Sequence, residues 1–241
     1  MKTFSNLYIF CFSSVLVLVV AGLLSFTAIV LEDRQRANIN IERKQMVLVA
    51  LGVQTTKSNV FDKYQEFIKD GIIIKAVDGS EVGKITEEIE MNLLSFLKRQ
   101  NDTPLNERLL LLYRAEKGGK QYVVIPVRGA GLWGPIWGNV AIDFSDMSTV
   151  YGVTFDHSGE TPGLGSQIGT TQFWDQFRNK RIFDANGRFV SISVEKPGTY
   201  TPNNHTVDGI SGGTITGNKL DEMLRNSLEQ YLPFFRQQKS N

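Results

Sequence analysis

One stretch decides the fold that we predict for this chain of 241 residues: QYVVIPVRGAGLWGPIWGNVAIDFSDMSTVYGVTFD, at residues 121–156. It holds three short runs rich in Val, Ile and aromatic residues, at 121–127, 139–144 and 150–156. Such residues favour strands, and the glycine-rich and polar segments between them favour turns. A fourth strand is predicted at 189–195, where apolar residues recur at every second position, as in a half-buried antiparallel strand.

Helices are predicted before and after these strands. Residues 32–51 carry apolar residues near helical spacing, and residues 85–99 place apolar side chains on one face and charged ones on the other. A last helix is predicted at 218–232, and Pro233 should end it. The whole pattern predicts an α+β fold in which helices flank a largely antiparallel sheet.

The N-terminal part of the chain is strongly apolar, because residues 7–31 contain no charge over 25 positions. As a helix this segment would be about 37 Å long, against a hydrocarbon core of about 30 Å. A cleaved signal peptide is the main alternative, but its apolar region is usually only about 7 to 15 residues long. We therefore predict a tail and transmembrane anchor at 1–31, a juxtamembrane helical part at 32–118 and a further part at 119–241.

The charges that flank the anchor indicate its orientation only weakly. Lys2 precedes the apolar segment, whereas Arg34, Arg36, Arg43 and Lys44 follow it. By this count the soluble part would be cytoplasmic, although long domains often cross a membrane regardless of the count.

Composition excludes several functions. The chain has 26 Lys and Arg against 25 Asp and Glu, so there is no basic excess for binding nucleic acid. Its single cysteine cannot form an intramolecular disulfide, a thiolate zinc site or an iron–sulfur cluster. His157 and His205 are 48 residues apart and do not indicate a metal site. Redox chemistry would therefore need an organic cofactor or the metal of a partner.

Glycine and small polar residues cluster three times in the second half of the chain. The clusters are GAGLWGPIWG at 129–138, GETPGLG at 159–165 and DGISGGTITG at 208–217. In the third, successive glycines can present backbone N–H groups to one point, and the helix that follows adds the positive end of its dipole. This combination predicts an anion site suited to phosphate. The alternative is a plain strand-to-helix turn in which Thr214 or Thr216 caps the helix.

The segment DGISGGT at 208–214 resembles the flavinylation motif of FMN-binding domains in respiratory complexes, which usually reads Asp-Gly-x-Ser/Thr-Gly-Ala-Thr. The anchor and the other two clusters resemble, in the same order, the family formed by the C subunits of the Na⁺-translocating NADH:quinone reductase. The related G subunit of the Rnf complex shares the second cluster and the motif, but it lacks the Gly-Leu-Trp segment that stands here at 131–133. One position departs from the motif, because Gly213 replaces its alanine.

The resemblance implies that FMN is attached to Thr214 through a phosphoester and is delivered by a separate flavin transferase. The rest of the implied cofactor site consists of Asp208, Ser211, Gly212 and Gly213 in the motif, Glu160, Thr161, Gly163, Leu164 and Gly165 in the second cluster, and Lys196 and Trp133 elsewhere. Lys196 could place positive charge near the flavin ring, and Trp133 and Trp137 could pack near it or form a docking surface. An exposed lysine at a strand end and a buried tryptophan are the respective alternatives.

For function, the resemblance implies an electron-transfer subunit of a six-subunit membrane complex. The subunit would relay electrons between an iron–sulfur centre and another flavin subunit, and would not catalyse the overall reaction alone. The family places such a subunit in the bacterial inner membrane as a single-pass protein with its soluble domain in the periplasm, against the charge count. The alternatives are the Rnf G subunit, or a membrane-anchored sensor that binds flavin without covalent attachment.

Overall fold

The chain divides into two compact units, Met1–Ile41 and Glu42–Asn241. The computed structural model describes residues 5–239, so Lys2, which enters the charge count, lies outside the described residues. Within that range, helix α1 (Asn6–Ala50) is the one helix long and apolar enough to cross a membrane. It contains the apolar segment 7–31 of the predicted anchor, whose side chains are largely exposed, whereas residues 1–4 of the predicted tail lie outside the described residues. The helix predicted separately at 32–51 is its continuation.

The second unit contains a six-stranded antiparallel sheet with the strand order β2-β1-β3-β4-β5-β6, so the predicted α+β fold is confirmed. Its strands are β1 (Ile68–Lys75), β2 (Glu81–Lys84), β3 (Leu109–Lys117), β4 (Lys120–Ala130), β5 (Pro135–Asp143) and β6 (Val150–His157). The helices are α2 (Val60–Phe67), α3 (Glu87–Met91), α4 (Leu93–Asp102), η1 (Gly165–Gly169), α5 (Thr171–Asp175), α6 (Thr214–Glu229) and α7 (Leu232–Lys239). Two short strands, β7 (Ser193–Glu195) and β8 (Thr206–Asp208), form a separate parallel pair.

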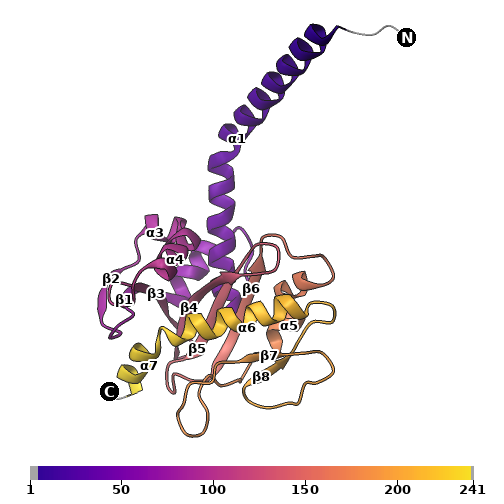
Figure 1. Cartoon of the computed structure of the whole chain (residues 1–241). Helices are drawn as coiled ribbons and strands as arrows, with labels where there is room; N and C mark the ends of the chain where they lie inside the picture. Colours follow the sequence, from indigo (N-terminus) through magenta and orange to yellow (C-terminus); the bar gives the residue numbers. More distant parts are fainter. Residues whose placement is uncertain (1–4, 240–241) are drawn as a thin grey trace. The chain divides into compact units, whose positions relative to one another are not determined.

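Helices cover both faces of the main sheet. In Figure 1, α6 crosses over β4 and β5, and its apolar residues, such as Leu224, share one core with Leu112 and Ile125 of the sheet. On β3, Leu111 points to the opposite face and packs against Phe96 of α4. Because β3 is buried on both faces, its sequence begins as a continuous apolar run and shows no alternation.

The prediction of a strand at 189–195 is wrong for most of that segment. Only Ser193–Glu195 forms a strand, β7, and this strand pairs in parallel with β8. Ser191 has a φ of 63°, in the left-handed region, and it interrupts the extended backbone just before β7. Ile192 and Val194 still point into the main core, which explains the alternation seen in the sequence.

The predicted helices differ from the observed ones at their ends. Residues 85–99 do not form one helix, because the chain breaks between α3 and α4 at Asn92, which caps both. The last predicted helix begins four residues earlier, at Thr214, and Pro233 lies in the first turn of α7, where its missing N–H is tolerated. The segment 32–118, predicted to be helical, also supplies β1, β2 and β3 to the sheet.

Gly138 on β5 has no room for a side chain, because an added Cβ would overlap the carbonyl oxygen of Thr154 on β6. We expect Gly138→Ala to lower the free energy of unfolding by about 2 to 3 kcal/mol, since overpacking forces the backbone to shift. Gly83→Ala on β2 is the matched control: nothing lies within 4 Å of its added Cβ, and the change should stay below about 0.5 kcal/mol. Urea unfolding followed by tryptophan fluorescence measures both, and equal effects would contradict the packing described.

Candidate functional site

Thr214 is the first residue of α6, and Gly213 occupies the N-cap position without a side-chain cap. The alternative in which Thr214 or Thr216 caps the helix is therefore wrong. The hydroxyl of Thr214 is half-buried and has no hydrogen-bond partner among the described residues. The first turn of this 16-residue helix contains no acidic residue. A phosphate on this hydroxyl would lie at the positive end of the helix dipole, beside unpaired backbone N–H groups.

The strand that leads to this loop is held in place by Gln176. Its Oε1 accepts a hydrogen bond from the backbone N–H of Asp208 at 2.9 Å, and its Nε2 donates to the carbonyl of Asp208 at 3.4 Å. The side-chain Oδ1 of Asp208 is buried and has no hydrogen-bond partner in the described part of the chain. Buried acceptors are normally satisfied, so this oxygen suits a donor group of a bound cofactor or a water.

The glycines of the attachment loop have different roles. Gly212 has a φ of 71°, which favours glycine, and an added Cβ would lie 2.6 Å from Cδ2 of Leu164. Gly213 has an ordinary φ of −109°, but its Cβ would lie 2.8 Å from Cγ2 of Ile210. The alanine that the motif usually has at 213 would thus require Ile210 to move, so the glycine here matches the local packing.

Glu160 brings the three glycine clusters together. Its Oε1 accepts hydrogen bonds from the backbone N–H groups of Leu132 at 2.8 Å and Trp133 at 3.1 Å, and its Oε2 accepts one from the Thr216 hydroxyl at 2.6 Å. The residue is only 4% exposed. Its own backbone N–H donates to Nδ1 of His157 at 3.3 Å, so that histidine supports the turn that places Glu160. The Glu160 side chain therefore holds loops and does not face solvent.

Exposed apolar side chains lie on these same loops. We call Leu132, Trp133, Leu164 and Ile215 the apolar rim. Trp133 is 69% exposed, which excludes the alternative of a buried core tryptophan. Apolar side chains on loops that meet beside Thr214 suit a flat ring that is partly apolar.

The remaining predicted residues of the second cluster form a tight exposed turn. The carbonyl of Thr161 accepts a hydrogen bond from the Leu164 N–H at 3.1 Å, and Gly163 has a φ of 76°. The Thr161 hydroxyl is exposed and has no partner among residues 5–239. Gly165 is buried, and it has no room for a side chain, since an added Cβ would overlap the Thr216 hydroxyl oxygen.

Ser211 and Lys196 are both exposed. Lys196 directly follows β7, which pairs with β8 and so runs beside the start of the motif. Its neighbour Glu195 leaves no room for a side chain at Gly209, where an added Cβ would overlap the Glu195 carbonyl. The structure thus brings the segment of Lys196 against the attachment loop. His205 is a loop residue whose Nδ1 lies 2.7 Å from the carbonyl oxygen of Arg181.

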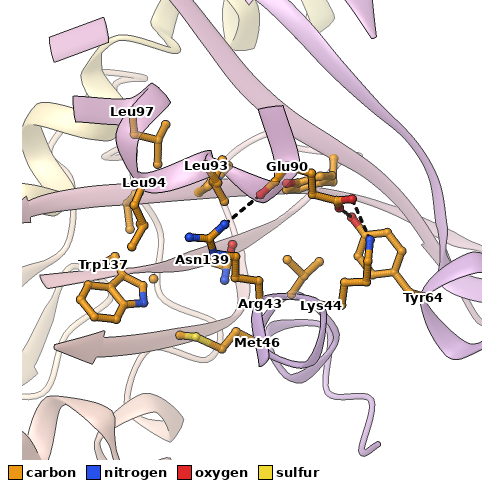
Figure 2. Close-up of a pocket in the computed structure, with 15 residues that line it drawn as sticks. Arg43, Lys44, Met46, Tyr64, Glu90, Leu93, Leu94, Leu97, Trp137 and Asn139 are labelled. Atoms are coloured by element: carbon orange, nitrogen blue, oxygen red, sulfur yellow. Dashed lines mark hydrogen bonds and ion pairs between the residues drawn. The ribbon is translucent and has the colours of Figure 1, made fainter. Parts of the chain in front are cut away.

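A separate hollow lies between α4 and the sheet, and Trp137 lines it together with Leu94 and Asn139 (Figure 2). Arg43 enters this hollow and donates hydrogen bonds to the carbonyl of Glu90 at 2.9 Å and to that of Met91 at 2.6 Å. Burial lowers the pKa of Arg43. The cavity measures about 20 Å³, which is room for about one water molecule and not for a flavin. The two tryptophans of the first cluster therefore lie in different places: Trp133 is on the exposed apolar rim, and Trp137 lines this separate small cavity.

Sequence reasoning missed four residues of the site: Gln176, Thr216 as the partner of Glu160, and Leu132 and Ile215 of the apolar rim. Thr216 and Glu160 are separated by 56 positions, so no local pattern links them. For Ile215 there was a signal, since an apolar residue directly follows the predicted attachment site in a cluster that consists mostly of glycine and hydroxyl residues.

Comparison with known proteins shows to which family the chain with this site belongs. A family model described as an FMN-binding domain matches residues 131–229, which include Glu160 and the three residues that donate hydrogen bonds to its carboxylate. The C subunit of the Na(+)-translocating NADH-quinone reductase of Vibrio campbellii is 30% identical over 223 residues, covering 83% of this chain and 82% of that protein. The crystal structure of the C subunit from Parabacteroides distasonis is 36% identical, with a TM-score of 0.74, and the match covers 85% of this chain and 96% of that one. That of NqrC from Shewanella oneidensis is 25% identical, with a TM-score of 0.70.

The fold, the rim around Thr214 and the family model together define the class: this is a protein with an FMN-binding domain and one long apolar N-terminal helix. Within that class, the chain belongs to the NqrC family, the C subunits of the Na(+)-translocating NADH-quinone reductase.

Proposed function

We propose that this chain is an FMN-carrying electron-transfer subunit of a membrane Na⁺-translocating NADH:quinone reductase. The relatives named above are subunits of such a reductase, and the chain covers more than four-fifths of the Vibrio protein. The observation that carries the proposal is the Thr214 hydroxyl, which is unpartnered within the described residues, begins α6 and is flanked by exposed apolar side chains. No comparable observation favours the Rnf protein or a sensor.

The FMN would be joined to Thr214 by a phosphoester that a separate flavin transferase makes. The residues fit this group: the helix N-terminus suits the phosphate, and the apolar rim suits the ring. Ser211, Gly212 and Gly213 would present the loop to the transferase. Asp208 would accept a hydrogen bond from the cofactor or from a water through Oδ1, which has no partner among the described residues. Thr161, Gly163, Leu164 and Trp133 would border the ring, and Lys196 would add positive charge beside it.

The test of covalent attachment is flavin fluorescence on a denaturing gel after co-expression with the transferase. A fluorescent band at the position of the full chain supports the proposal. A wild-type chain that loses all flavin on denaturation would instead be a noncovalent flavin protein, which is the sensor alternative.

When bound, FMN supplies the exchange of one or two electrons. The protein would hold it, shield one side of it and fix its orientation, while other subunits oxidise NADH and reduce quinone. We place its electron donor at an iron–sulfur centre and its acceptor at the flavin of another subunit, in an assembly of six subunits. The chain alone would then show no NADH:quinone reductase activity.

We propose that residues 1–31 anchor the chain in the bacterial inner membrane, that 32–118 form the juxtamembrane part and 119–241 the FMN-binding part of its soluble domain, and that this domain lies in the periplasm. Protease added to intact spheroplasts should then remove a tag at the C-terminus as completely as it does after lysis. A cytoplasmic protein serves as the control for intact membranes. Protection of the tag until lysis would reverse the orientation, in agreement with the charge count.

A further inference from the structure

Glu160 occupies space that two glycines leave open. A Cβ at Gly131 would overlap its Oε1, and a Cβ at Gly165 would lie 2.6 Å from its Oε2. Neither glycine has a positive φ, so close packing, and not a left-handed backbone, requires glycine at both positions: the carboxylate is the nearest group at Gly131, and it lies beside the Thr216 hydroxyl at Gly165. Two of the glycine clusters are therefore built around this one buried side chain.

The loop that carries Trp133 joins β4 to β5, and the strand pairing on either side of it ends at Ala130 and Pro135. Within the loop, Gly131 donates a backbone hydrogen bond to Gly134 at 2.7 Å. The Trp133 side chain is 69% exposed, so packing does not fix its place. Among the described residues, the hydrogen bonds that join this loop to the second glycine cluster are those of the two N–H groups that point at Glu160.

The other end of the link is the first turn of α6. Thr216 lies two residues after Thr214, and a helix turns by about 200° over two residues, so the two side chains point in nearly opposite directions. Thr216 is 2% exposed and points inward to Glu160, while Thr214 is half-buried with an unpartnered hydroxyl among the described residues. Fixing Thr216 thus sets the rotation of the turn, and with it the direction of Thr214.

We propose that Glu160 is a positioning residue for the flavin: its carboxylate locks the Trp133 loop to the turn that carries Thr214. The inference rests on the proposed function, because it requires FMN on Thr214. Through this lock, Trp133 keeps a fixed place relative to the attached ring, and the ring keeps a fixed environment. The redox potential of a phosphoester-bound flavin depends on that environment, since the attachment leaves the ring itself unmodified.

The test compares Thr216→Val, which removes the hydroxyl at nearly constant volume, with Thr216→Ser, which keeps it. The first readout needs no flavin: amide hydrogen exchange of the peptide containing Leu132 and Trp133, in the full chain in detergent without the transferase. We expect exchange about tenfold faster in Thr216→Val and unchanged in Thr216→Ser, because the carboxylate loses one of its charge-assisted hydrogen bonds.

The second readout is the midpoint potential of the flavin in the chain co-expressed with the transferase, with gel fluorescence to report attachment. The potential should shift in Thr216→Val and return to the wild-type value in Thr216→Ser. Glu160→Gln provides a second variant outside the attachment loop, and it should also shift the potential, since it replaces the charge-assisted hydrogen bonds of the carboxylate with weaker neutral ones.

Unchanged exchange in Thr216→Val would show that the lock does not hold the loop. Faster exchange with wild-type potentials in Thr216→Val and Glu160→Gln would make Glu160 a purely structural residue, and either result overturns the inference. If the wild-type chain carries no covalent flavin, the proposed function fails and flavin positioning fails with it. The exchange measurement still decides separately whether the lock exists.

Discussion

Replacing Thr214 with alanine will abolish the flavin fluorescence of the denatured chain after co-expression with the transferase. Alanine offers no oxygen for a phosphoester, so we expect the band to fall to background. The substitution should leave folding intact, since the Thr214 hydroxyl makes no hydrogen bond within the described residues and alanine favours helices. The change in the free energy of unfolding should therefore stay within about 0.5 kcal/mol.

Thr171→Ala is the matched control for this variant. Thr171 is also the first residue of a helix, α5, and it is exposed without a hydrogen-bond partner in the described part of the chain. Its flavin band should equal that of the wild type. A band that persists in Thr214→Ala would place the attachment on another hydroxyl, with Ser211 and Thr216 as the next residues to change.

The second large effect concerns the buried ion pair between Lys44 and Glu90. Nζ of Lys44 lies 2.8 Å from Oε2 of Glu90, and the two side chains are 10% and 18% exposed. The Tyr64 hydroxyl donates to Oε1 of Glu90 at 2.8 Å, and burial raises the pKa of Tyr64 far above its ordinary value, so it remains a donor. We expect Glu90→Ala to lower the free energy of unfolding by about 3 to 5 kcal/mol, because it leaves the Lys44 charge buried and unpaired.

Two comparisons make this prediction specific. The double variant Lys44→Met with Glu90→Leu should recover most of the loss, because apolar residues of similar size can replace a buried pair. Glu222→Ala breaks an exposed pair with Lys219, whose side chains are 41% and 57% exposed, and should cost less than about 1 kcal/mol. Urea unfolding in detergent, followed by tryptophan fluorescence, measures all three variants. A loss in Glu90→Ala no greater than in Glu222→Ala would contradict the buried pair.

The features that could be predicted are those that depend on residues close together in the sequence. The anchor follows from 25 consecutive uncharged residues, and β4, β5 and β6 follow from runs of β-branched and aromatic residues separated by turns. The motif at 208–214 is correctly placed close to the start of the last helix, although α6 begins at Thr214 itself and not at the predicted residue 218.

The missed elements are those whose local pattern is ambiguous. The run of leucines that opens β3 has no alternation, because both faces of the strand are buried, and such a run is equally compatible with a helix. The alternation of apolar residues at 189–195 predicted a strand where most of the segment is irregular. Side chains on a bent segment can also point alternately into a core.

Residues near each other in the chain thus determined the class of fold, the long apolar N-terminal helix and the position of Thr214 close to the start of the last helix. Only the folded chain decided that Glu160 faces inward, that Trp133 and Trp137 separate, and that Lys44 meets Glu90. The physical reason is the same in each case. Helix, strand and turn preferences act over a few residues, whereas the partner of a buried carboxylate is chosen by packing between segments 26 to 56 positions apart in this chain.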